Sequence, residues 1–156
     1  MPSTVDVPPA LAPVFRAAEE LVGRYFANKV ERPTEGTIEI DSERYVLVRA
    51  ASLSERFFHV VREIYGAERR AEADDFARNI LFDLAHAIGK SDAERFAATQ
   101  IESDDPIARL SAGPIHFAFT GWARVRVHEE SIPTPDEDYY LFYDHPYSFE
   151  SDAWQK

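Results

Sequence analysis

The chain has 156 residues, of which 45% are apolar and 13% aromatic, so it can form one globular domain with a buried core. Its formal net charge of −11 would repel a phosphate backbone, which argues against direct nucleic-acid binding. The absence of cysteine excludes disulfides and thiolate metal sites. The sequence has neither an apolar run of membrane-spanning length nor a secretory signal. We therefore expect a cytoplasmic protein without a membrane segment.

The N-terminal third predicts one helix followed by a short hairpin. Residues 1–13 are rich in proline, and we expect them to be flexible. Residues 14–29 place apolar side chains on one side of a predicted helix. Thr37–Ile40 and Tyr45–Val48 are short runs of strand-forming residues on either side of a turn signal, which is typical of a hairpin.

Two further helices are predicted in the middle of the chain. Ser52 with Glu55 has the spacing of a capping box, and Gly66 should end the helix that follows it. A second helix should run from about Ala67 to Ile88 and end at Gly89. We expect that helix to bury an apolar stripe, which consists of Phe76, Ile80, Leu81, Leu84 and Ile88.

The last third changes to an alternating pattern. Gly113-Pro114 should end a short helix, and apolar and polar residues then alternate over residues 115–127, which predicts a long strand. Gly121 would mark a bulge or bend in that strand. Tyr139–Tyr143 predicts a second strand, which Pro146 would interrupt. The order of elements indicates a single α+β domain with helices packed on an antiparallel sheet.

The motifs of common enzymes and cofactor sites are missing. Gly89-Lys90-Ser91 lacks the earlier glycine that a phosphate-binding loop needs. The five histidines have no metal-ligand spacing, and Asp83 with His86 is only a helical pair. There is no nucleophile elbow, and the carboxylates around Asp136 fit a solvated acidic turn. We expect no enzyme activity, no cofactor and no metal.

Aromatic residues crowd the two predicted strands, and they allow two interpretations. They could fill an ordinary sheet core, or they could line an apolar pocket with a few polar anchors. Stacked rings with one hydrogen-bonding group would suit a small aromatic or other planar ligand. The predicted ligand-binding residues are His116, His145, Trp122, Phe117, Tyr143 and His86.

A series of short motifs resembles one known family in order and spacing. They begin at Glu35-Gly36-Thr37-Ile38, continue through Tyr65-Gly66-Ala67-Glu68-Arg69, and reach Ala112-Gly113-Pro114-Ile115-His116 and Ser148-Phe149-Glu150. Over roughly residues 34–152 the chain is similar to the N-terminal sensor domain of bacterial activators of aromatic catabolism, of the XylR/DmpR type.

The resemblance implies a non-enzymatic sensory domain that binds a small-molecule effector and controls an output domain, often an ATPase that activates transcription. It implies a division into residues 1–33, a flexible segment and helix that could mediate homodimerisation, and residues 34–156, the sensory domain. We expect that domain to be truncated at its C-terminal end, without the vinyl-reductase-type zinc subdomain of the family. The alternative is a protein–protein interaction module that kept the sensor fold without a ligand.

The resemblance also assigns roles to individual residues. His116 matches the histidine that holds the phenol hydroxyl in phenol-sensing members. His145 stands where those members have a tryptophan that contacts phenol, and His86 replaces a tyrosine of a family motif. These departures weaken the case for phenol itself as the effector, so an aromatic or other planar apolar compound is expected.

Overall fold

The computed structural model describes residues 2–99, 106–131 and 141–149. The chain packs as two compact units, one built from residues 1–47 and 96–148 and the other from residues 48–95 and 149–156. Helices and two small, mainly antiparallel sheets make up the fold, which confirms the predicted α+β class. No helix among the described residues combines the length and apolar content that crossing a membrane requires.

Two helices form the centre of the first unit. Helix α1 (Ala12–Ala27) has the predicted amphipathic pattern, and it buries Phe15, Val22 and Tyr25 against its neighbours. Helix α4 (Pro106–Thr120) packs along α1 and places Ile115 in the same core. Pro106 occupies the first position of α4, where a backbone N–H would have no helical partner, so the missing N–H of proline costs no hydrogen bond.

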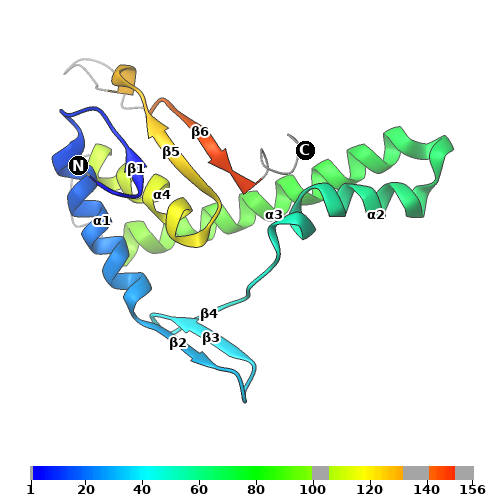
Figure 1. Ribbon diagram of the computed structural model, residues 1–156, viewed down its shortest axis with the longest axis horizontal. Helices are drawn as coiled ribbons and strands as arrows, with labels where there is room; N and C mark the ends of the chain where they lie inside the picture. The colour runs from blue at the N-terminus through cyan, green and yellow to red at the C-terminus, as the bar shows by residue number, and fades with distance from the viewer. Residues whose placement is uncertain (1, 100–105, 132–140, 150–156) are drawn as a thin grey trace. The chain divides into compact units, whose positions relative to one another are not determined.

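A three-stranded sheet covers α4 in the order β1 (Val5–Asp6), β5 (Ala123–Val127), β6 (Tyr143–Ser148), as Figure 1 shows. Strand β5 alternates buried and exposed residues, so one face of the sheet joins the core. Strand β1 runs parallel to β5, and β6 runs antiparallel to it. The short 3₁₀-helix η3 (Glu129–Ser131) follows β5.

The N-terminal segment, for which a flexible conformation was expected, is an ordered part of this unit. Val5 and Val7 are buried in the core with Leu11, and Asp6 pairs with Arg126 in the sheet register. The proline count suggested flexibility, but proline is compatible with an edge segment whose side chains are covered.

The predicted hairpin forms around Asp41-Ser42, but its second strand was predicted too late in the chain: β4 covers Glu43–Tyr45, and Val46–Val48 are exposed and lie outside it. The hairpin also has one additional strand. Strand β3 (Thr37–Ile40) pairs with β4 and also with β2 (Lys29–Arg32), which the sequence did not indicate. Asp41 and Ser42 both have positive φ, as the two central residues of a type I′ hairpin turn require.

The long strand predicted over residues 115–127 is wrong in its first half. Helix α4 continues through Gly113-Pro114 to Thr120, and only Ala123–Val127 is a strand. Gly121 is the glycine that ends α4, with φ +77°, and not a bulge. Its N–H donates to Ala118 O (3.3 Å) and the N–H of Trp122 donates to Phe117 O (2.9 Å), which is the hydrogen-bond pattern of a Schellman motif.

The second strand of the predicted pair also differs. Strand β6 covers Tyr143–Ser148, so it begins where the predicted strand over Tyr139–Tyr143 should end, and residues 139 and 140 lie outside the described residues. Pro146 lies inside β6 and does not interrupt it.

The second unit is built mainly from α2 (Glu55–Tyr65) and α3 (Arg70–Thr99), with 3₁₀-helices η1 (Ala50–Leu53) and η2 (Ala67–Arg69) before each of them. Gly66 ends α2 as predicted, with φ +78°. Ser52 lies inside η1, so the predicted capping box is not formed. Helix α3 passes through Gly89, and the stripe expected to be buried is largely exposed: Phe76, Ile80, Leu84 and Ile88.

Candidate functional site

His116 is buried in the third turn of α4, on the side that faces α1. Its side chain is only 6% exposed, and its ring centroid lies 5.4 Å from that of Phe26 on α1. Phe26 in turn stacks on Phe119 at 5.0 Å with nearly parallel planes. Because Phe119 follows His116 by three residues, both side chains lie on the same helical face.

Tyr45 of β4 completes this arrangement. Its ring lies 6.5 Å from that of Phe26, and its hydroxyl is 2.7 Å from the hydroxyl of Tyr25. We call Phe26, Tyr45, His116 and Phe119 the inner ring cluster. The cluster reaches the surface, because 39% of Phe119 is exposed.

A buried imidazole surrounded by aromatic rings can make both polar and apolar contacts with a ligand. A neutral histidine carries one donor and one acceptor nitrogen, so it can orient a hydroxyl or carbonyl group of a bound molecule. The surrounding rings offer flat apolar faces, which favour stacking or edge contacts with a planar ligand. The inner ring cluster therefore combines one polar group with an apolar wall, as small-molecule sites do.

Three other predicted residues form a second group of rings around Phe117, the next residue of α4. The ring of Phe117 lies 5.8 Å from that of His145 in an edge-to-face contact, and His145 lies 5.4 Å from Tyr143. We call Phe117, Tyr143 and His145 the outer ring cluster. Consecutive helical residues point about 100° apart, so His116 and Phe117 serve different clusters.

An irregularity in β6 positions His145. Arg124 pairs with Tyr147 and Arg126 with Asp144, so two residues of β6, His145 and Pro146, stand opposite Val125 alone. This is the geometry of a β-bulge, in which one extra residue is accommodated and a side chain is re-aimed. The bulge also explains why a proline is tolerated within this strand.

The two remaining predicted residues, Trp122 and His86, lie at other places in the fold. Trp122 is half-buried at the end of α4, where its backbone caps the helix. His86 belongs to the second unit, where its exposed ring stacks on Phe82 at 6.2 Å. The sequence interpretation missed Phe26 and Tyr45. A helical period through His116 and Phe119 would have pointed to a helix, and so to a partner such as α1.

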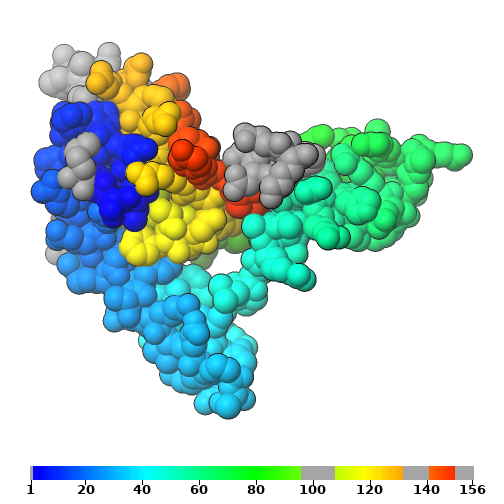
Figure 2. Space-filling model, in the orientation of Figure 1, coloured from blue at the N-terminus to red at the C-terminus, as the bar shows by residue number. Residues whose placement is uncertain are grey.

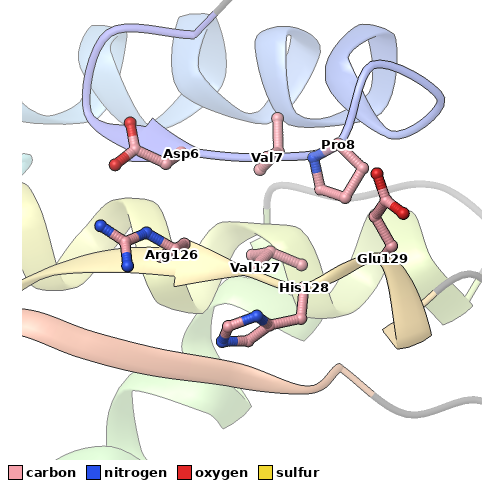
Figure 3. A pocket seen from close by; sticks show the side chains of 7 residues that line it. All are labelled: Asp6, Val7, Pro8, Arg126, Val127, His128 and Glu129. Carbon is pink, nitrogen blue, oxygen red and sulfur yellow. The ribbon is translucent and has the colours of Figure 1, made fainter.

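A separate hollow of about 310 Å³ opens where β1 diverges from β5, and none of the predicted binding residues lines it. Figure 3 shows its seven lining residues: Asp6, Val7, Pro8, Arg126, Val127, His128 and Glu129. The ring of His128 points toward β6, where its Nε2 lies 3.2 Å from Asp144 Oδ2. No group of three or more potential metal ligands occurs among the described residues.

The charged side chains near this hollow are engaged with one another. Arg124 donates a 2.6 Å hydrogen bond to Asp6, and this bond raises the pKa of Arg124 above its ordinary value. Arg126 lies 3.9 Å from the carboxylate of Asp144 that His128 also contacts. These ion pairs join β1 to β5 and β5 to β6, which favours a structural role for them.

A family model, XylR_N, described as an activator of aromatic catabolism, matches residues 30–132. The matched segment is more than half of the chain, and it contains α4 with His116 and most of β2 to β5. A search of curated proteins finds no match to the chain.

Proposed function

We propose that this chain is an input domain that binds a small aromatic effector, because it belongs to the XylR_N family of activators of aromatic catabolism. The observation that carries the proposal is the inner ring cluster, in which a buried imidazole lies among aromatic rings. Family membership supports the regulatory role, and the composition of the cluster supports the class of effector.

The effector would bind against Phe26 and Phe119, and His116 would form a hydrogen bond with one polar substituent. Phe119 is the exposed member of the cluster, and a rotation of its ring would open a path to the imidazole. A ring of similar size could then replace the stacking contact between Phe26 and Phe119. The outer ring cluster would form a second contact surface on the other side of α4.

Binding would regulate an output domain through a shift between two states of the input domain. The effector can move that equilibrium only if it binds the two states with different affinities. Helix α4 is the element best placed to respond, because it carries His116, packs on α1 and leads directly into β5. The output domain could lie in the same chain or in another one, and we further propose that the protein acts as a homodimer.

Ligand-induced thermal stabilisation tests the proposal. Phenol and toluene form a matched pair in which a methyl group replaces the hydroxyl, and cyclohexane tests whether an aromatic face is needed. An effector at a hundred times its dissociation constant should stabilise the fold by about 2.7 kcal/mol. For a chain of this size that corresponds to a rise in Tm of roughly 5–10 °C.

The variant His116→Phe keeps a planar ring and removes both nitrogens. It should retain stabilisation by toluene and lose any preference for the hydroxylated compound, a change of about three- to tenfold in relative affinity. His59→Gln changes an exposed histidine in the other unit and serves as the control. If no aromatic compound stabilises the wild-type chain, or if both variants respond alike, the effector proposal is wrong.

The alternative function, a protein interaction module without a ligand, is favoured by a different observation. The apolar side chains left exposed on α2 and α3 form a surface of the kind that partners cover. A chain that associates in solution but is stabilised by no compound would support this alternative.

A further inference from the structure

Helix α1 contains a glycine, Gly23, at a position where its packing does not require one. Gly23 lies inside the helix, and a β-carbon placed on it would lie 3.7 Å from Cζ of Phe119, which is an ordinary van der Waals distance. An alanine would therefore fit at this position. Glycine inside a helix is less favourable than alanine, by roughly four- to fivefold in the equilibrium between helix and coil. Gly23 thus weakens α1 without a gain in packing.

Gly23 lies beside the inner ring cluster. It precedes Phe26 by three residues, so the two residues are neighbours on one face of α1. Phe119 of α4 meets this face at both places, because its ring stacks on Phe26 and the tip of the ring lies nearest to Gly23. No other atom of the described residues outside α1 comes within 4 Å of the point where the β-carbon would lie. In Figure 2, α1 (blue) and the end of α4 (yellow) adjoin on this unit.

We propose that Gly23 is a positioning residue of the effector site, and that it leaves the space into which the Phe119 ring moves when an effector stacks on Phe26. The inference rests on the proposed function and deepens it, because it says where the displaced ring goes. The planes of Phe26 and Phe119 differ by only 9°, so Phe119 covers a flat face of Phe26. An effector cannot share that face, and the Phe119 ring must therefore move.

Two directions are open to the Phe119 ring. Phe119 is 39% exposed, so its ring could turn into solvent, but it would then lose apolar contact with α1. A shift from Phe26 toward Gly23 keeps the ring against the helix. Carbon atoms approach one another to about 3.5–4.0 Å, so a β-carbon at position 23 would block this shift, whereas glycine leaves room of about one methyl group. Gly23 thus allows the ring to leave Phe26 and remain covered.

The family match does not assign this role. The segment that matches the XylR_N model begins at residue 30, after Gly23 and Phe26. His116 and Phe119 lie within that segment. The effector site would therefore combine a matched part on α4 with a part on α1 that lies outside the match.

Thermal unfolding of the whole chain, with and without toluene or phenol, tests the inference through Gly23→Ala. Without a compound, this variant should raise Tm by roughly 1–4 °C, because alanine is the better helix former. The affinity for the compound, obtained from the dependence of Tm on its concentration, should fall about tenfold. That factor corresponds to the loss of roughly 60 Å² of apolar contact, about a third of a phenylalanine side chain. A purely structural role of Gly23 would not weaken binding while it stabilises the fold.

Gly89→Ala is the matched control. Gly89 is also a glycine inside a helix, but it lies in the other unit, and nothing among the described residues lies within 4 Å of a β-carbon placed there. This variant should raise Tm to a similar extent and leave the affinity for toluene or phenol unchanged. An equal loss of affinity in both variants would overturn the inference.

A double variant tests whether Gly23 acts through Phe119. In a Phe119→Ala background no ring has to move, so Gly23→Ala should no longer weaken binding. Phe119→Leu removes the ring but keeps an apolar side chain, and it serves if Phe119→Ala fails to fold. A tenfold loss of affinity in these backgrounds too would contradict a role through Phe119. A lower Tm of Gly23→Ala without any compound would show that the β-carbon does not fit, which also overturns the inference.

This inference and the effector proposal can fail separately. If toluene or phenol stabilises the wild type and Gly23→Ala with the same affinity, the role of Gly23 is refuted and the effector proposal stands. If no aromatic compound stabilises the wild type, both are wrong.

Discussion

Replacing Glu19 with glutamine should loosen the N-terminal segment from α1. The Glu19 carboxylate accepts hydrogen bonds from the backbone N–H of Thr4 (2.8 Å) and from its hydroxyl (2.7 Å). It also accepts bonds from the N–H and hydroxyl of Ser3. These bonds hold β1 in place. Partial burial acts to raise the pKa of Glu19, but the hydrogen bonds from Thr4 and Ser3 together outweigh it, so the pKa lies below its ordinary value of 4.5.

The magnitude follows from the number and exposure of these bonds. A hydrogen bond to a charged group contributes about 1.5–3 kcal/mol when buried, and the exposed contacts of Ser3 contribute much less. The amide of glutamine can still accept some of the bonds. We therefore expect Glu19→Gln to lower the free energy of unfolding by about 1–2 kcal/mol at neutral pH, which is a fall in Tm of roughly 2–8 °C.

The direction in which the destabilisation by Glu19→Gln changes with pH can also be predicted. Because the pKa of Glu19 is lower in the folded state, its stabilisation is complete above pH 4.5 and is lost as the pH falls through the folded value. Urea unfolding followed by circular dichroism should therefore show a gap between wild type and Glu19→Gln that narrows below pH 4.5. Glu20→Gln removes the same charge from an exposed neighbour and should be near neutral. A gap that is constant with pH, or an equal effect of both variants, would refute the reasoning.

Other substitutions test single features of the fold. Gly121→Ala should lower the free energy of unfolding by about 1–2 kcal/mol, because φ is +77° there. Gly89→Ala should raise it by about 0.5–1 kcal/mol, because that glycine lies inside α3 with open space around it, and thermal unfolding would show opposite shifts in Tm. Tyr25→Phe should cost about 1 kcal/mol, because it removes the hydroxyl that meets Tyr45, and an unchanged unfolding midpoint in urea would contradict that contact.

Elements with strong local signals could be predicted from the sequence. The apolar spacing of α1, the hairpin around Asp41-Ser42 and the helix stop at Gly66 each depend on a few neighbouring residues. The pairing of β1 with β5 could not be predicted, because it joins residues about 120 positions apart and Val5–Asp6 is too short to show a period.

The region around His116 was misinterpreted because two periods fit the same residues. From Ile115 to Thr120 nearly every side chain is apolar or small, so alternation and a 3.6-residue period are both satisfied. Proline at position 114 then favoured a strand, since it removes one helical hydrogen bond. Packing against α1 decides in favour of the helix, because it buries Ile115 and His116 together.

Because His116 and Phe117 lie on a helix, a ligand could influence the rest of the molecule through two sets of contacts. On a strand, His116 and Phe117 would point to opposite faces of one sheet, and a ligand at either would act on that sheet alone. On α4 they contact α1 through Phe26 and β6 through His145. A ligand that displaced α4 by a small rotation would alter both contacts at once, because packed side chains cannot adjust independently. A single helix between two ring clusters is thus the element through which we expect an effector to change the fold.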